Sequence, residues 1–183
     1  MIITLALLLL CIAAFLFQDP WMLQNFSLIS GLTFSEPWRL VTSMFLHADF
    51  MHLLFNMFAL LMFGLYLERK VGRTWFLIIY LASGIIGGLG FQAFSAPGDM
   101  AIGASGAIFG IIGALVVLEP KMTVYVYLIP LPIAVAGILY ALIEVVGMGQ
   151  VDNIAHSAHL LGLAGGFIVA KIYENTAGDG KWS

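Results

Sequence analysis

Residues 103–110 read GASGAIFG, a run that places Ser105 among glycine and small apolar residues in a strongly apolar part of the chain. A serine in an apolar helix usually bonds its own backbone or joins two helices, and the run alone favours such a structural role. Gly106 and Gly110 form a GxxxG pair, which lets a second helix backbone approach closely. The segment that packs on these two glycines therefore determines which side chains Ser105 meets.

The composition around this run predicts a membrane protein. Of the 183 residues, 62% are hydrophobic and 9% are charged, whereas a soluble domain carries about 25% charged residues. We expect one domain over residues 1–183, embedded in a lipid bilayer. The net charge of −3 provides no basic patch and argues against a nucleic-acid partner. The single cysteine, Cys11, excludes an internal disulfide and a cysteine metal site.

Six segments are apolar and long enough to be candidates for membrane-spanning helices, for which about 17 residues is the lower limit. They are residues 1–17, 51–67, 75–94, 102–118, 131–147 and 155–173. The fold class that they predict is an all-α membrane protein with a bundle of six transmembrane helices and a long external loop over 18–50. The first segment lacks a basic leader and a cleavage site, so we expect a retained span. Residues 123–129 alternate like a strand and are expected at the membrane interface.

The basic residues predict the orientation of this bundle. If both termini are cytoplasmic, six of the seven Lys and Arg residues fall on the cytoplasmic side and only Arg39 falls outside. Cytoplasmic loops carry such an excess of basic residues. Because no organelle-targeting segment precedes the first span, we expect a prokaryotic plasma membrane.

This orientation places Ser105 and all four histidines at or just below the external face. Segments 102–118 and 155–173 then run in the same direction, with Ser105 about 5 Å and His159 about 6 Å deep at 1.5 Å per residue. Gly162 and Gly166 form a second GxxxG pair, so the two helices are expected to pack closely.

Close packing at the two GxxxG pairs would bring Ser105 and His159 within hydrogen-bond reach. An imidazole at that distance can take the hydroxyl proton, which is the minimum for nucleophilic catalysis. Asp99 and Asp152 lie outside this depth-matched pair, so we expect a dyad rather than a triad. His52 and Asn56 share one face of segment 51–67 at spacing i, i+4. They could donate hydrogen bonds to an oxyanion together with the Ser105 backbone N–H, or Asn56 could simply join helices.

Three stretches, in this order on the six segments, resemble the rhomboid intramembrane serine proteases. PWRLVTSMFLHADFMHLLFNM (37–57) is similar to the external loop and second helix of that family. GASGAIFG (103–110) matches its Gly-x-Ser-Gly motif, and AHSAHLLGLAGG (155–166) matches its histidine helix. The resemblance covers nearly the whole chain and is to the minimal six-helix prokaryotic form.

The resemblance implies a serine endopeptidase that cleaves single-span membrane proteins near the outer membrane face, with no cofactor and no metal. Ser105 would be the nucleophile and His159 the base, while His52 and Asn56 would stabilise the oxyanion. The physiological substrate and the oligomeric state stay open.

Three further residues receive supporting roles from the same resemblance. Gly103 would leave room for the substrate peptide beside Ser105. Phe109 falls where the family places an aromatic ring against the catalytic histidine, although the family residue is tyrosine. His156 lies one turn from His159, and the local pattern assigns catalysis to His159.

Other functions fit the sequence less well. A metalloprotease would need a motif such as HExxH, which is absent, and no carboxylate or cysteine completes an evident zinc site with the histidines. An aspartyl protease would need two intramembrane aspartates. A transporter could run a histidine relay through Glu144, although no inverted repeat is visible and Glu144 could simply reach the outer interface. An inactive rhomboid-like protein that binds membrane proteins typically lacks the serine or the histidine, and this chain has both.

Overall fold

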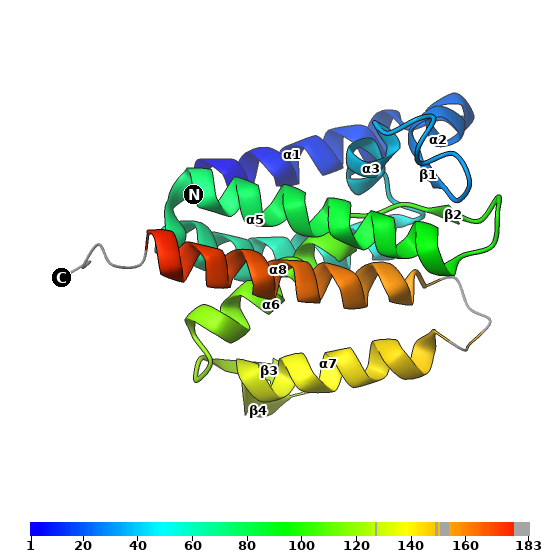
Figure 1. Ribbon diagram of the computed structural model, residues 1–183. Helices are drawn as coiled ribbons and strands as arrows, with labels where there is room; N and C mark the ends of the chain where they lie inside the picture. The colour runs from blue at the N-terminus through cyan, green and yellow to red at the C-terminus, as the bar shows by residue number, and fades with distance from the viewer. Residues whose placement is uncertain (127, 149, 151–153, 178–183) are drawn as a thin grey trace.

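The computed structural model describes residues 1–126, 128–148, 150 and 154–177, and the described chain is mostly helical (Figure 1). The elements are α1 (Ile2–Phe17), α2 (Pro20–Phe26), β1 (Leu28–Ile29), α3 (Arg39–Thr42), η1 (Ser43–Phe45), α4 (Phe50–Ala59), η2 (Leu60–Gly64), α5 (Leu65–Phe94), β2 (Met100–Ala101), α6 (Ser105–Leu118), β3 (Thr123–Val126), β4 (Ile129–Pro132), α7 (Ile133–Gly147) and α8 (His156–Thr176).

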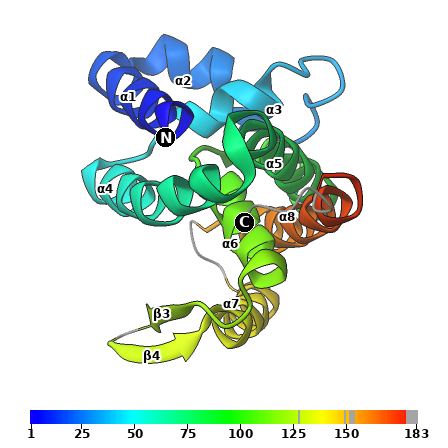
Figure 2. The same cartoon turned by 90° about the vertical axis from the view of Figure 1, so that its left-hand side faces the viewer.

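Helices α5, α6 and α8 pack against one another at the centre of the bundle. Helix α1 lies on one side of this group and α7 on the opposite side, as two perpendicular views show (Figures 1 and 2). Tyr80, Ile111 and Leu115 are fully buried between the central helices. The outer helices instead expose large apolar side chains, among them Leu9 and Ile138. An apolar outer surface of this kind suits a protein surrounded by lipid.

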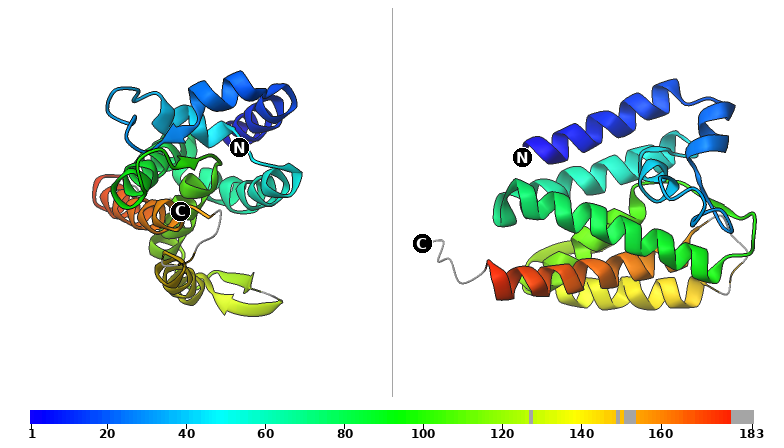
Figure 3. Two further views of the ribbon diagram at one scale, coloured as in Figure 1. Left: turned by 90° about the vertical axis from the view of Figure 1, so that its right-hand side faces the viewer. Right: turned by 45° about the horizontal axis from the view of Figure 1, so that its top comes forward.

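One helical run among the described residues, Phe50–Phe94, is long and apolar enough to cross a membrane by length and composition. Three shorter apolar helices are Ile2–Phe17, Ser105–Leu118 and Ile133–Gly147. The long run contains two of the predicted spans. It turns back on itself at Gly72, whose φ of 80° and ψ of 168° are not helical (Figure 3). The number of membrane crossings stays a prediction.

Two helix starts differ from the sequence-based prediction. Helix α6 begins at Ser105 rather than at residue 102, so Ser105 is the first helical residue and does not lie three residues inside. The preceding Gly103 has a φ of +125°, a conformation that glycine adopts readily. The extended backbone therefore ends at Gly103, just before the helix begins. Helix α7 begins at Ile133 rather than at residue 131, because Pro130 and Pro132 belong to β4.

Two short antiparallel strand pairs correct the expectation of an all-α chain. Strands β3 and β4 form a hairpin, so the predicted strand character of this region is confirmed. Strands β1 and β2 pair Leu28 with Ala101 and Ile29 with Met100. Gly103 N–H also donates to the Ser43 carbonyl at 2.9 Å. The 18–50 region is thereby joined to the segment that leads into Ser105.

Candidate active site

The two GxxxG pairs meet backbone to backbone. A Cβ added to Gly162 would overlap the carbonyl oxygen of Gly106, and a Cβ added to Gly166 would overlap that of Gly110. Only glycine fits at Gly162 and Gly166 without moving helix α6 away from α8. The close helix contact expected from the sequence is therefore confirmed.

Ser105 and His159 lie together above this glycine contact. The Ser105 Oγ is 2.7 Å from the His159 Nε2, a distance at which the hydroxyl donates to the ring nitrogen. The Phe109 ring stacks on the imidazole with centroids 4.5 Å apart and planes 3° from parallel. Phe109 in turn meets Tyr140 edge to face at 5.9 Å. The His159 ring is therefore held in one plane, facing the serine.

Glu144 of helix α7 reaches the other side of the same imidazole. Its Oε1 lies 3.2 Å from the His159 Nδ1, and its Oε2 lies 2.5 Å from the His156 Nδ1. Glu144 does not reach the outer interface, which the sequence had left possible, because only 5% of the residue is exposed. The one signal that could have found it is the presence of a single carboxylate in an apolar segment.

Gly103 and His52 are neighbours on the opposite side of the serine. A Cβ on Gly103 would lie 2.8 Å from the His52 imidazole and 3.7 Å from the Ser105 Oγ. The His52 Nδ1 accepts a hydrogen bond from the Ala48 N–H at 3.4 Å. The neutral ring then carries its proton on Nε2, which is the nitrogen beside Gly103. His52 can therefore act as a donor next to Ser105.

Asn56 is buried one turn after His52 on α4. Its Nδ2 donates to the His52 carbonyl at 2.8 Å, which leaves the second hydrogen of the amide group available. Among the described residues, no hydrogen bond joins Asn56 to Ser105, and the buried Asn56 Oδ1 has no hydrogen-bond partner. Asn56 therefore lies one turn along α4 from His52 and keeps one amide hydrogen to donate.

His47 is fully buried behind His52, with the two ring centroids 5.2 Å apart. Gln18 holds its backbone, because the Gln18 Nε2 donates to the His47 carbonyl at 2.7 Å. Burial, together with the nearby His52, lowers the pKa of His47 to about 4. His47 is therefore a neutral packing residue near pH 7 and does not reach the serine.

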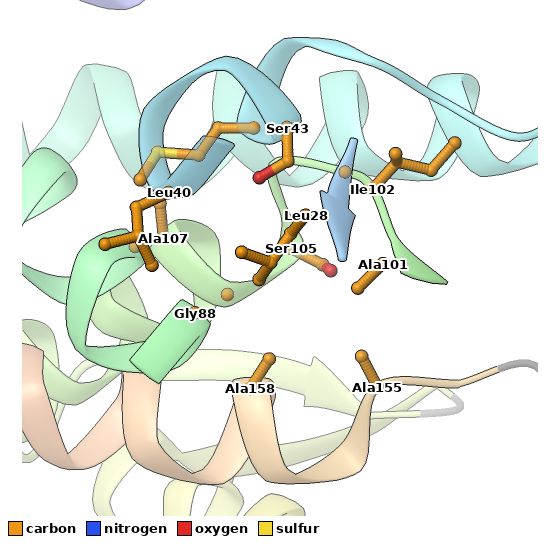
Figure 4. A pocket seen from close by; sticks show the side chains of 14 residues that line it. Leu28, Leu40, Ser43, Gly88, Ala101, Ile102, Ser105, Ala107, Ala155 and Ala158 are labelled. Atoms are coloured by element: carbon orange, nitrogen blue, oxygen red, sulfur yellow. The ribbon is translucent and has the colours of Figure 1, made fainter. Parts of the chain in front are cut away.

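A pocket opens beside Ser105, and small residues line much of it. Figure 4 shows the Ser105 side chain beside Ala101, with Ala155 and Ala158 at the beginning of the last helix lying across from both. Gly103 and Gly106 also line the pocket, and its far wall includes Leu28, Leu40, Ser43 and Met44.

Asp99 and Asp152 were expected to lie outside the pair formed by Ser105 and His159. Asp99 accepts a hydrogen bond from the Ala96 N–H at 2.8 Å and shapes the loop before β2. Asp152 lies outside the described residues.

Comparisons with known proteins give matches over most of the chain. The rhomboid domain model matches residues 35–175. The chain is 37% identical over 147 residues to the putative rhomboid protease YdcA of Bacillus subtilis, covering 76% of this chain and 69% of that protein. It is 42% identical over 137 residues to the rhomboid protease GluP of the same organism, covering 74% of this chain and 26% of GluP. RHOMBOID-like protein 6, mitochondrial, of Arabidopsis thaliana is 36% identical over 137 residues, covering 74% of this chain and 44% of that protein.

The matched span contains Ser105, His159 and their neighbours described above, and it runs from the 18–50 region to the last helix. These sequence similarities extend over most of the chain. The protein is therefore a member of the rhomboid family and an integral membrane protein.

Proposed function

We propose that the protein is an intramembrane serine endopeptidase that cleaves single-span membrane proteins. The observation that carries this proposal is the 2.7 Å contact between the Ser105 Oγ and the His159 Nε2. The relatives named as rhomboid proteases support the same reaction. The inactive rhomboid-like alternative has no such support from the site, because both residues that it typically lacks are present and in contact.

The chemistry follows from the two facing atoms. The Ser105 Oγ attacks the scissile carbonyl carbon while its proton passes to the His159 Nε2. The tetrahedral intermediate collapses, the leaving amine takes the proton from His159, and the new amino terminus departs. The acyl group then rests on Ser105 as an ester. A water molecule gives its proton to His159 and attacks the ester. His159 then returns this proton to the Ser105 Oγ as the carboxylic acid product leaves.

Three donors can stabilise the oxyanion of each tetrahedral intermediate. Ser105 is the first residue of α6, and no side chain caps that helix end, so its backbone N–H is free of an intrahelical partner. The His52 Nε2–H lies beside Gly103, and the free amide hydrogen of Asn56 lies one turn deeper. Charge that develops next to such preorganised donors is strongly stabilised.

The pocket supports a preference for a small residue before the cleaved bond. Ala101, Ala155 and Ala158 narrow it, while Gly103 allows close backbone approach to Ser105. A substrate helix has its backbone amides locked in hydrogen bonds, so a segment must unwind before attack. We therefore expect substrates with small or helix-breaking residues at the outer end of the span, which enter sideways from the bilayer.

Cleavage of a single-span model substrate by the purified protein in liposomes tests this function. Wild type should cut near the outer membrane surface, after a small residue, and Ser105→Ala should give no product. Mass spectrometry of the products locates the cut. Cleavage in the cytoplasmic half of the span, or cleavage unchanged when leucine replaces the small residues, would refute the pocket and the route of entry.

A further inference from the structure

Glu144 is a buried charged residue that the proposed dyad does not use. Glu144 is 5% exposed, although its neighbours Ile143, Val145 and Val146 on α7 are more than half exposed. An ionised carboxylate away from water is costly unless it is paired or hydrogen-bonded. Helix α8 supplies partners for Glu144, because His156 and His159 each contact one of its oxygens. The placement therefore links the carboxylate to the same imidazole that faces Ser105.

The two contacts of His159 determine where its ring proton lies. The Nδ1 is 3.2 Å from the Glu144 Oε1, and the Nε2 is 2.7 Å from the Ser105 Oγ. A carboxylate only accepts hydrogen bonds, so the Nδ1 must carry a hydrogen. The Nε2 of the neutral ring is then the acceptor, which is the state needed to take the serine proton.

His156 holds the second oxygen of the carboxylate. Its Nδ1 lies 2.5 Å from the Glu144 Oε2, and its side chain is almost fully buried. With one histidine on each oxygen, the carboxylate cannot rotate away from His159 without losing a partner. His156, one turn before His159, therefore keeps Glu144 in place rather than facing Ser105 itself.

We propose that Glu144 is the positioning residue of a Ser105–His159–Glu144 triad. This inference rests on the proposed protease function and extends it beyond the dyad. Glu144 holds the His159 tautomer that bears hydrogen on Nδ1, and its charge stabilises the imidazolium formed during attack. In that step the proton moves from the Ser105 Oγ to the His159 Nε2, the Nδ1–H stays on the ring, and Glu144 stays ionised.

The pH dependence of a reaction that uses His159 depends on the groups packed around its ring. Helix α8 contributes His156, α7 contributes Glu144 and Tyr140, and α6 contributes Ser105 and the apolar ring of Phe109. Helix α4 contributes His52, which lies beyond Gly103. Glu144 is thus the carboxylate in contact with the imidazole among the described residues. Replacing it with glutamine removes that charge and preserves the side-chain volume.

Kinetics of Glu144→Gln provide the first test. A glutamine amide can donate to Nδ1 and so favour the wrong tautomer. We expect kcat to fall at least about 100-fold with KM changed less than about threefold, since loss of the orienting carboxylate in a serine triad costs up to about 10⁴-fold. The acid limb of kcat/KM should move to lower pH, because the protonated imidazole loses its counter-charge. Val145→Ala, on the exposed face of α7, is the matched control and should keep wild-type kinetics.

Wild-type kcat together with an unchanged pH profile in Glu144→Gln would overturn the inference while leaving the protease function intact. Absence of cleavage by wild type would instead count against the protease function. The two failures are therefore distinguishable.

Nitrogen-15 spectra of histidine-labelled wild-type protein provide a second test that needs no stable Glu144 variant. The His159 ring signals are assigned by their loss in His159→Ala. We expect a protonated Nδ1 and an unprotonated Nε2 at neutral pH. Hydrogen on Nε2 of the neutral ring would overturn the inference, whatever the kinetics of Glu144→Gln show.

Discussion

Gly166 of α8 packs directly on the carbonyl oxygen of Gly110 in α6, with no space for a Cβ between the two backbones. This contact and its counterpart at Gly162 set the separation of the two helices that carry Ser105 and His159. The distance between the Ser105 and His159 side chains therefore depends on two positions that have no side chain at all.

Gly166→Ala should force the helices apart and weaken both folding and cleavage. Overpacking of this kind costs about 1–3 kcal/mol, so we expect a lower unfolding temperature in detergent and a clear loss of cleavage rate. Gly106→Ala is the matched control, because its Cβ would meet its nearest neighbour, the Ala158 carbonyl oxygen, at 3.5 Å. It should keep or raise stability, since alanine favours a helix by up to about 1 kcal/mol over glycine. Equal stability of the two variants would contradict the packing argument.

The two oxyanion donors that we propose on α4 should each contribute to the rate without being indispensable. Losing one such donor typically costs about 2.7–4 kcal/mol, or about 100–1,000-fold in kcat. His52→Ala and Asn56→Ala should both be slowed to this extent, because the Ser105 backbone N–H remains. Steady-state cleavage kinetics measure the effect. An Asn56→Ala variant at full rate would show that Asn56 only supports the helix through its bond to the His52 carbonyl.

Cysteine labelling from outside the cell tests the predicted orientation. The single cysteine, Cys11, is buried, and replacing it with alanine provides a background for new cysteines. Positions Asp99, Gln150 and Arg73 are all exposed on the protein surface. An impermeant thiol reagent should label cysteines at 99 and 150 and should not label one at 73. Strong external labelling at 73 would invert the orientation and place Ser105 at the cytoplasmic side.

The pH dependence of stability should report the buried His47. Its pKa is lowered from 6.5 to about 4, first by burial and then by His52. Between these two values the unfolded chain binds a proton that the folded chain does not, so the free energy of unfolding falls as the pH falls. The largest slope for one group is about 1.4 kcal/mol per pH unit. His47→Phe should show a shallower fall than wild type in detergent unfolding experiments, and an identical slope would contradict this role.

The sequence predicted the helices and the Ser105–His159 contact because both depend on strong local signals. The helices follow long apolar runs, and the contact follows paired glycines that match on two helices. The position of Glu144 could not be predicted in the same way. Both its neighbours and the rest of α7 are apolar, so no periodic pattern tells which face of that helix meets α8.

The pairing of Leu28–Ile29 with Met100–Ala101 was also beyond sequence analysis. A ladder of two residues is too short to give an alternating pattern, and its strands lie about seventy residues apart in the chain. The start of α6 was misplaced for a related reason. Gly103 leaves the extended region at a positive φ, and apolar composition alone continues past that residue without a break.

Covalent labelling with a fluorophosphonate probe tests the central claim most directly, because the probe reacts with a serine that a base has activated. Peptide mass spectrometry of the labelled, folded protein locates the adduct. It should lie on Ser105 in wild type, disappear in His159→Ala, and persist at a reduced rate in His156→Ala, where His159 still contacts Ser105. An adduct on a different serine, or labelling of Ser105 that is unchanged without His159, would contradict a Ser105 nucleophile activated by His159.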